Sequence, residues 1–342
     1  MSEPMGSDPF LGLPSPDRAE ALAVAAERSG RPASILEKDV WVVFCLAALF
    51  DSDQGAHLSF KGGTSLSKAH GIIARFSEDV DLTYDVRCLL PEIATGIGAE
   101  ALPPSRSQEQ RWSRLVRARL PDWVEQVALP RVSGRIHKEG LEANPRAVGE
   151  FIHVECESVV ALVTDYVAPN VLLEFGARST GEPAEVKAVG CDAAPHLPSL
   201  SFPVALPRVL VAERTFWEKA TAAHAFCLQG SFQGVRFSRH WYDLAMFEAS
   251  GRARKALLDR DLGRIVARHK QLFFATRDDS GAWIDYSEAV EGGMRLVPDG
   301  RPVLALADDY QRMLEAGLLE IDAPTFEEVI ARCRALEERA NG

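Results

Sequence analysis

The spacing of hydrophobic positions differs between the two parts of the chain, and it changes near residue 205. Before it, short apolar runs bounded by glycine, proline or polar residues predict strands. These strands are expected at 58–60, 80–84, 151–160 and 171–175. Helical spacing of apolar residues predicts helices at 17–29, 34–50, 65–73 and 111–126. From Ala212 onward the long apolar stretches all have helical spacing, at 213–226, 240–249, 253–274 and 326–340.

This change in hydrophobic spacing predicts an α/β unit followed by a helical unit. We expect a loose N-terminal segment and first helix over 1–30, an α/β domain over 31–205 and a helical domain over 206–342. A passage rich in glycine and proline, at about 176–208, precedes the change. At the start of the second helix, Ser34 and Glu37 have the spacing of a capping box.

Composition narrows the class of protein. The chain has 342 residues, 46% hydrophobic and 25% charged, as in a globular protein large enough for two domains. No apolar run approaches the ~18 residues of a membrane span. The first twenty residues carry no secretory signal, so we expect a cytoplasmic protein. The six cysteines are far apart without a CxxC pair, which favours reduced thiols over disulfides or zinc. The sequence indicates no oligomeric state.

The net charge of −11 argues against a large nucleic-acid footprint but leaves room for a local one. Five arginines gather between Arg106 and Arg119, around Trp112. This segment could face the phosphates of an RNA or a nucleotide. It could also be the solvated side of an amphipathic helix whose apolar stripe includes Trp112, Leu115 and Leu120.

The stretch from Leu58 to Tyr84 carries the strongest chemical signal. Asp79 and Asp81 are two residues apart in a predicted strand, so their carboxylates point to the same side. Two like charges held so close repel each other unless a cation lies between them. Mg²⁺ is the usual solution, because it takes oxygen ligands and leaves room for substrate phosphates. The structural alternative is an exposed strand face, or a partner such as Arg75.

Upstream of the acid pair, a double glycine separates a strand from a helix. Gly62 and Gly63 allow the backbone to approach a phosphate closely, and Thr64 and Ser65 add hydroxyl donors. Lys61 either contacts phosphate or lies on the surface. A strand, two glycines and a helix often form only a tight turn. Combined with the acid pair, however, the turn is typical of nucleotidyl transfer.

Further along the chain, charged residues interrupt apolar segments. Glu174 lies inside a predicted buried strand and needs a metal ion or a cation such as Arg178, because an unpaired buried acid is costly. Lys219 lies in an apolar helix, either as a surface residue with a buried stem or as a charge that holds a triphosphate. Asp243 follows two aromatic residues and needs a fixed partner: Arg239, Lys219 or a substrate hydroxyl.

KGGTSLSK (61–68) and RFSEDVDL (75–82) resemble the motif of the AbiEii/AbiGii family of nucleotidyltransferase toxins, which includes the mycobacterial MenT toxins. The further matching pieces are EKD (37–39), LEFGARS (173–179), AERTFWEKATAAH (212–224), SRHWYDLA (238–245), HKQLFF (269–274) and DDYQRM (308–313). Two departures from the commonest nucleotidyltransferase pattern stand out. The gap between the glycine turn and the acid pair is longer, and His240 replaces the first acid of the usual RDxYD.

The resemblance implies a polymerase-β-type nucleotidyltransferase fold, a mixed sheet with flanking helices followed by a helical domain. It implies a toxin of a type IV toxin–antitoxin or phage-defence pair, with its antitoxin encoded nearby. Such a toxin would use Mg²⁺ or Mn²⁺ to transfer a nucleotide from an NTP to an RNA acceptor. The 3′ end of tRNA is the acceptor that the family suggests, and its modification would block translation.

The family's site residues can be carried over to matching positions. The residues expected to hold the nucleotide are Lys61, Gly62, Gly63, Thr64 and Ser65, and we add Arg178. Asp79 and Asp81 would bind the metal with Glu174 as a third ligand, and Lys219 and Asp243 would complete the active site. Ser77 matches a serine that, in part of the family, is an inhibitory phosphorylation site.

Two hypotheses from other classes stay open. A kinase or protein-modifying toxin could use the same metal site and transfer the γ phosphate instead of the nucleotide. A non-catalytic protein could merely bind a nucleotide or an antitoxin, although clustered acids have no purpose in such a protein.

Overall fold

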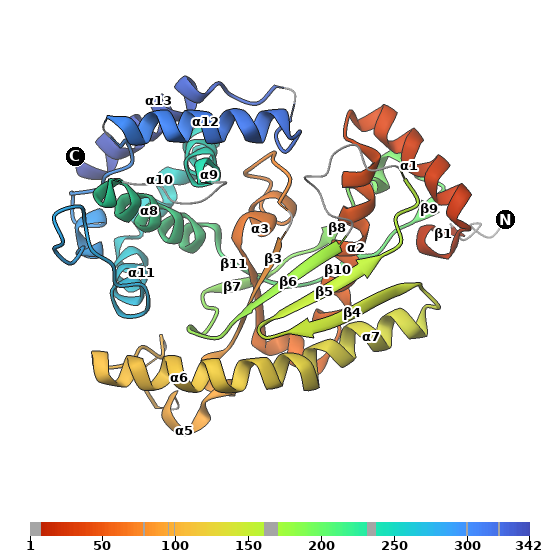
Figure 1. The fold of residues 1–342 in the computed structure, drawn as a ribbon, viewed down its shortest axis with the longest axis horizontal. Helices are drawn as coiled ribbons and strands as arrows, with labels where there is room; N and C mark the ends of the chain where they lie inside the picture. Colours follow the sequence, from red (N-terminus) through yellow and green to blue (C-terminus); the bar gives the residue numbers. More distant parts are fainter. Residues whose placement is uncertain are drawn as a thin grey trace.

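The computed structural model describes residues 8–77, 79–94, 96–98, 100–160, 170–230, 237–298, 300–320 and 322–342. Its centre is a seven-stranded mixed sheet (Figure 1). The strands, in spatial order, are β4 (Ala143–Val148), β5 (Phe151–Cys156), β6 (Asn170–Gly176), β3 (Asp79–Tyr84), β2 (Leu58–Lys61), β11 (Arg208–Leu210) and β7 (Ala184–Val186). Two short pairs lie outside it, β1 (Asp8–Pro9) with β9 (Leu200–Ser201) and β8 (Val189–Gly190) with β10 (Val204–Ala205).

Helices flank the sheet and make up the C-terminal part of the molecule. The helices that precede β11 are α1 (Ser15–Ser29), α2 (Ala33–Phe50), α3 (Gly62–Lys68), α4 (Val86–Leu89), α5 (Pro91–Ala94), α6 (Arg106–Trp123) and α7 (Leu129–Lys138). The later ones are α8 (Ala212–Gln229), α9 (Ser238–Ala249), α10 (Arg252–Leu258), α11 (Arg260–Phe273), α12 (Arg301–Glu315) and α13 (Phe326–Asn341). Figure 1 shows α8 to α13 grouped to one side, while α6 and α7 run along the lower edge of the view. None of the described helices is both long and apolar enough to cross a membrane.

Buried apolar side chains form two clusters, and the boundary between them lies close to the change in hydrophobic spacing near residue 205. The first includes the sheet and runs from Phe10 to Val209. The second starts at Ala212 and also takes in Leu66, Ile72 and Ile73, so the segment after the double glycine packs into the helical core. The expected fold class is therefore confirmed: a mixed α/β part followed by helices. Since β11 continues the sheet beyond residue 205, the cores divide slightly later than expected. The domain limits themselves stay a prediction.

The expected capping box at the second helix is wrong. α2 begins after Pro32, and no side chain caps it. Ser158 Oγ and Val159 N donate hydrogen bonds to the Glu37 carboxylate over 2.6 and 2.8 Å. Because α2 is apolar and buried almost all round, Glu37 faces the interior, where these donors satisfy it better than a helix end exposed to water would.

The expected single helix over 253–274 is two helices. Asp259 interrupts it, since its side chain accepts a hydrogen bond from Leu262 N and so caps α11. Residues from the last turn of α11, His269 and Lys270, line a cavity together with residues of the sheet.

Candidate functional site

The acid pair lies at the centre of the sheet, on β3. Val80 and Leu82 are buried, and Asp79 and Asp81 alternate with them on the other face. Asp81 is in register with Lys61 of β2 on one side and with Glu174 of β6 on the other. Three charged side chains from three neighbouring strands therefore form a row on one face, with Asp79 beside it. The alternation of side chains along a strand predicted that both acids share one face. The pairing of β3 with β2 and β6 places Lys61 and Glu174 beside Asp81.

Gly62 is required by the acid pair itself. Its φ of +77° lies in the left-handed region, and a Cβ at this position would overlap the Asp81 carboxylate. At Gly63 a Cβ would lie 2.5 Å from Arg75 Nη2 and 2.9 Å from Ser77 Oγ. The double glycine thus makes room for side chains of the chain's own site, in addition to any phosphate.

The hydroxyls of Thr64 and Ser65 are used in hydrogen bonds within the protein. Both residues are buried, and their hydroxyls donate to the carbonyl oxygens of Asp79 and Gly62 over 2.5 and 2.9 Å. These bonds brace the turn between β2 and α3 against β3. The geometry therefore gives the two hydroxyls a structural role and offers no support for the expected phosphate contact.

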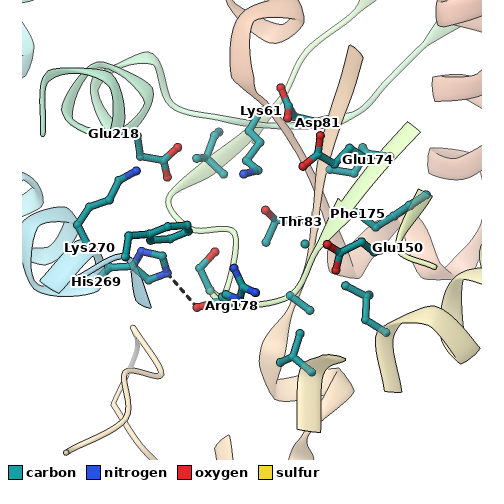
Figure 2. A pocket seen from close by; sticks show the side chains of 18 residues that line it. Lys61, Asp81, Thr83, Glu150, Glu174, Phe175, Arg178, Glu218, His269 and Lys270 are labelled. Carbon is teal, nitrogen blue, oxygen red and sulfur yellow. Dashed lines mark hydrogen bonds between the residues drawn. The ribbon is translucent and has the colours of Figure 1, made fainter. Parts of the chain in front are cut away.

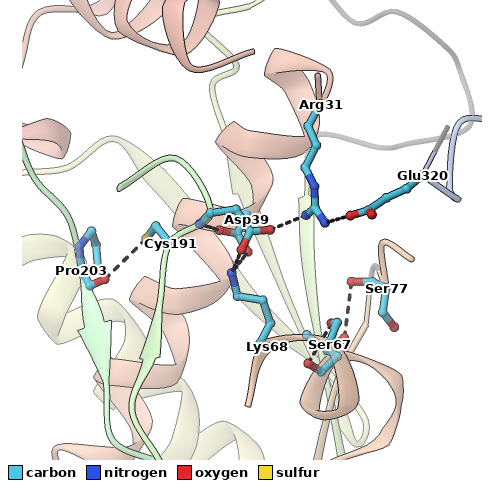
Figure 3. Close-up of polar contacts among 10 residues, drawn as sticks. Arg31, Asp39, Ser67, Lys68, Ser77, Cys191, Pro203 and Glu320 are labelled. Carbon is cyan, nitrogen blue, oxygen red and sulfur yellow. Dashed lines mark hydrogen bonds and ion pairs between the residues drawn. The ribbon is translucent and has the colours of Figure 1, made fainter. Parts of the chain in front are cut away.

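The end of α3 is held by an ion network (Figure 3). Lys68 Nζ lies 2.6 Å from carboxylate oxygens of both Asp39 and Asp192. Arg31 joins Asp192 to Glu320, which precedes the last helix. Because α3 begins at the double glycine, this network fixes the glycine turn relative to both cores.

Asp243 is fully buried between two cations. Arg75 donates two hydrogen bonds to its carboxylate, over 2.7 and 2.9 Å, and Lys219 Nζ lies 2.7 Å from the same group. Burial alone would raise the pKa of Asp243, but Arg75 and Lys219 outweigh it and hold this pKa well below its usual range. Lys219 is thus a buried residue rather than a surface one. The partner that the sequence did not indicate is Arg75, and Arg239 instead lies near Asp79.

A cavity of about 280 Å³ opens in front of the charged row (Figure 2). Lys61, Asp81, Glu174 and Arg178 form its wall on the sheet side. The opposite wall is formed by Glu218 of α8, by His269 and Lys270 of α11, and by Phe274. His269 Nε2 donates to the carbonyl oxygen of Arg178 over 3.0 Å and so joins the two walls. Lys219 and Asp243 do not line this cavity, and Asp79 and Ser77 border a smaller one with Arg239.

The acids in the row repel each other. Burial raises the pKa of Asp81, and Asp79 adds to the rise, although Lys61 and Lys219 oppose it. Burial also raises the pKa of Glu174, and Asp81 contributes. Such a cluster favours a bound cation.

The same surroundings contain cations without an acidic partner. Lys61, Arg178, Arg239 and Lys270 form no ion pair with any residue that the structure describes, and Asp79, Asp81 and Glu174 form none either. The expected pair of Glu174 with Arg178 is therefore not made. Acids that need a cation lie next to cations that need an anion, which suits a metal–polyphosphate ligand.

The donor set fits Mg²⁺ or Mn²⁺ in part. Asp79 and Asp81 offer two carboxylates on one face, and Mg²⁺ commonly binds one or two carboxylates together with substrate phosphates. Within the described ranges, no three His, Cys, Asp or Glu side chains come together as a metal-binding group. Two protein ligands completed by phosphates therefore match the geometry better than a cage, and Glu174 as a third ligand stays a prediction.

Sequence reasoning missed the far wall of the cavity. Glu218 and Lys270 come from helices more than 130 residues beyond the acid pair, so spacing could not place them beside it. A signal was present in the two charged residues Glu218 and Lys219 within an apolar helix. The other signal was the HKQLFF piece, 269–274, which was noted without a role.

One comparison with known proteins shows a family over most of the chain. The family model described as nucleotidyl transferase AbiEii toxin, type IV toxin–antitoxin system, matches residues 45–332. No curated protein matches the chain. Among solved structures, the chain is similar to MenT4, a nucleotidyltransferase toxin from Mycobacterium tuberculosis, with 18% identity over 96% of this chain and 94% of that chain. The TM-score is 0.47, and at that level the likeness carries no further argument.

Proposed function

Because this chain belongs to the nucleotidyl transferase AbiEii toxin family of type IV toxin–antitoxin systems, we propose that it transfers a nucleotide from an NTP to the 3′ end of an RNA. The acceptor in this proposal is tRNA, and its modification blocks translation. The reaction depends on Mg²⁺ or Mn²⁺, takes place in the cytoplasm and is restrained by an antitoxin encoded nearby.

One observation supports the proposal: acids and cations that form no ion pair gather around the acid pair, at the main cavity and at the smaller one beside it. Asp79, Asp81 and Glu174 lack partners among the described residues, and so do Lys61 and Arg239 beside them. An NTP with its divalent ion would satisfy both sets at once. Without a polyanionic ligand, these charges offset one another only in part, at a cost in folding stability.

Each residue has a role that follows from its position. Asp79 and Asp81 are the metal ligands, and when bound the ion would neutralise phosphate charge and activate the attacking hydroxyl. Lys61 and Arg239 bind phosphate oxygens on either side of the acid pair. The RNA hydroxyl attacks the α-phosphorus in line and loses its proton to solvent water, the bond between the α-phosphorus and the bridging oxygen breaks, and pyrophosphate leaves.

Asp243 acts through its neighbours. It is fully buried, and both of its oxygens are bonded to Arg75 or Lys219, so it contacts no substrate in our proposal. It holds Lys219 and Arg75 beside the acid pair, where their positive charge favours ionised Asp81. We therefore assign Asp243 as a positioning residue and Lys219 as an electrostatic one.

The RNA would approach along α6. Val116 and Leu120 of this helix reach the cavity wall, while Trp112 is buried. On its exposed side, Arg111 and Arg114 form no ion pair within the described part of the chain. The arginine segment is thus an amphipathic helix, and its exposed side remains available for phosphates.

The decisive experiment uses labelled nucleotides. Purified protein, total RNA and each NTP labelled at the α-phosphate are incubated with Mg²⁺ or with EDTA. We expect label on RNA only with Mg²⁺, and none with Asp79→Ala. Asp261→Ala is the matched control, because this aspartate lies on the surface with a side chain 90% exposed.

Three outcomes would count against the proposal. Label retained by Asp79→Ala would remove the acid pair from the reaction. Transfer from the γ-phosphate would indicate a kinase. Absence of transfer from every NTP, together with normal growth on overexpression without the neighbouring gene, would indicate a non-catalytic binding protein.

A further inference from the structure

Phe274 is an aromatic side chain left open on the wall of the cavity. It follows α11 directly, lines the cavity, and is 44% exposed, whereas most large aromatic side chains of the described chain are buried. Lys270 Nζ lies 4.8 Å from the centre of its ring, and Arg178 Cζ lies 5.8 Å from it. A ring exposed inside a cavity and flanked by two cations is a surface on which another aromatic ring can stack.

Glu218 adds a hydrogen-bond acceptor to the same wall. Burial would raise the pKa of Glu218, but Lys61, Arg214 and Lys270 lower it below its usual value, so the carboxylate is ionised. Its hydrogen bond from Arg214 Nε is long, at 3.4 Å. In Figure 2, Glu218 and Lys270 lie on one side of the cavity and Glu174 on the other.

We propose that Phe274 and Glu218 form the nucleobase subsite for the NTP. The base stacks on Phe274, and Glu218 accepts a hydrogen bond from an amino or ring N–H group of the base. The triphosphate extends to Lys61 and Asp81, which line the sheet side of the same cavity. This inference rests on the proposed function and deepens it, since it assigns the residues that bind and select the nucleotide.

The size of the cavity favours a nucleoside over a longer piece of RNA. About 280 Å³ lies just below the ~300–1,000 Å³ typical of small-molecule sites. His269 limits it further, because its hydrogen bond to the Arg178 carbonyl joins the two walls. We infer that such a space takes a single nucleotide, so the RNA end must approach from the open side.

The test compares two ligands that differ only by the nucleoside. Binding of each NTP and of inorganic triphosphate, both with Mg²⁺, is measured by titration calorimetry on the full chain. We expect Phe274→Ala to weaken NTP binding by roughly 5- to 150-fold, the range for loss of one stacked base. Binding of inorganic triphosphate should not change, and Phe274→Trp should restore NTP binding.

Two further variants sharpen the result. Trp283→Ala is the matched control, since this tryptophan is also exposed and covered by an arginine, Arg277, but does not line the cavity. It should bind every ligand as the wild type does. Glu218→Gln should change the ratio of affinities among the four NTPs, because it replaces an acceptor by a group that also donates.

The outcomes separate this inference from the proposed function. If the wild type binds neither NTP nor triphosphate, the proposed function itself fails. If the wild type binds both and Phe274→Ala weakens both equally or neither, the nucleobase subsite is refuted. The subsite is also refuted if Phe274→Ala raises the KM for RNA while NTP binding stays unchanged, since the ring would then contact the acceptor.

Discussion

Replacing Asp243 by asparagine tests the buried ion triad beside the acid pair. The substitution keeps the shape of the side chain but removes its charge, so Arg75 and Lys219 lose the carboxylate between them. Both cations are buried, with side-chain exposures of 5% and 10%. Removing one member of a buried ion pair typically costs ~3–5 kcal/mol, because the remaining charge is left uncompensated. Here two cations share one acid, so we expect a loss at the upper end of that range.

Urea unfolding followed by circular dichroism measures this loss, with Asp261→Asn as the surface control. The control should change the free energy of unfolding by less than about 0.5 kcal/mol. The pH dependence gives a second check. Because the folded-state pKa of Asp243 is depressed, its contribution is present above the ordinary value of 3.8 and is lost as the pH falls through the folded value. The difference between wild type and Asp243→Asn should therefore shrink only below about pH 4. A variant within 1 kcal/mol of wild type at pH 7 would refute the reasoning.

Three further substitutions probe other parts of the site. Gly62→Ala forces a side chain into the left-handed region and against Asp81, so unfolding by urea should show a loss of at least ~1–2 kcal/mol, and RNA labelling should disappear. Ser77→Asp places a negative charge beside the acid pair and should raise the KM for NTP while the melting temperature stays within a few degrees. Arg111→Glu with Arg114→Glu should raise the KM for RNA, leave that for NTP unchanged, and flatten the dependence of RNA binding on salt by about one unit of slope per lost phosphate contact. Unchanged constants in either case would contradict the role assigned.

Local periodicity was sufficient to predict the centre of the sheet. The two-residue spacing of Asp79 and Asp81 placed both carboxylates on one face because strands alternate strictly. Register was beyond such reasoning: that Lys61 and Glu174 flank Asp81 depends on which strands pair, a choice made by the whole core. The long helix expected over 253–274 failed for a similar reason, since a single aspartate, Asp259, ended one helix and capped the next.

Partners of buried charges were the hardest feature to predict. Arg239 has the i,i+4 spacing that places it on the same face of α9 as Asp243, and so it was a reasonable candidate. In the structure the partner of Asp243 is instead Arg75, 168 residues away in sequence. Arg75 reaches Asp243 because the segment after the double glycine packs into the helical core. There the Arg75 guanidinium makes two parallel hydrogen bonds to the Asp243 carboxylate. No local rule contains that contact.

The position of the triad explains how one site can hold acids and cations together before any ligand arrives. Arg75, Lys219 and Asp243 together carry one surplus positive charge, which lies beside the two negative charges of the acid pair. This surplus charge offsets part of the repulsion between the Asp79 and Asp81 carboxylates, which burial of Asp81 strengthens. The sheet can therefore keep both carboxylates on one face. The walls of the cavity come from two hydrophobic cores, which the hydrogen bond between His269 and Arg178 joins, while the triad fixes the segment that leads into β3 against α8 and α9. Loss of either connection should therefore alter nucleotide binding through the spacing of the walls, even though Asp243 touches no substrate.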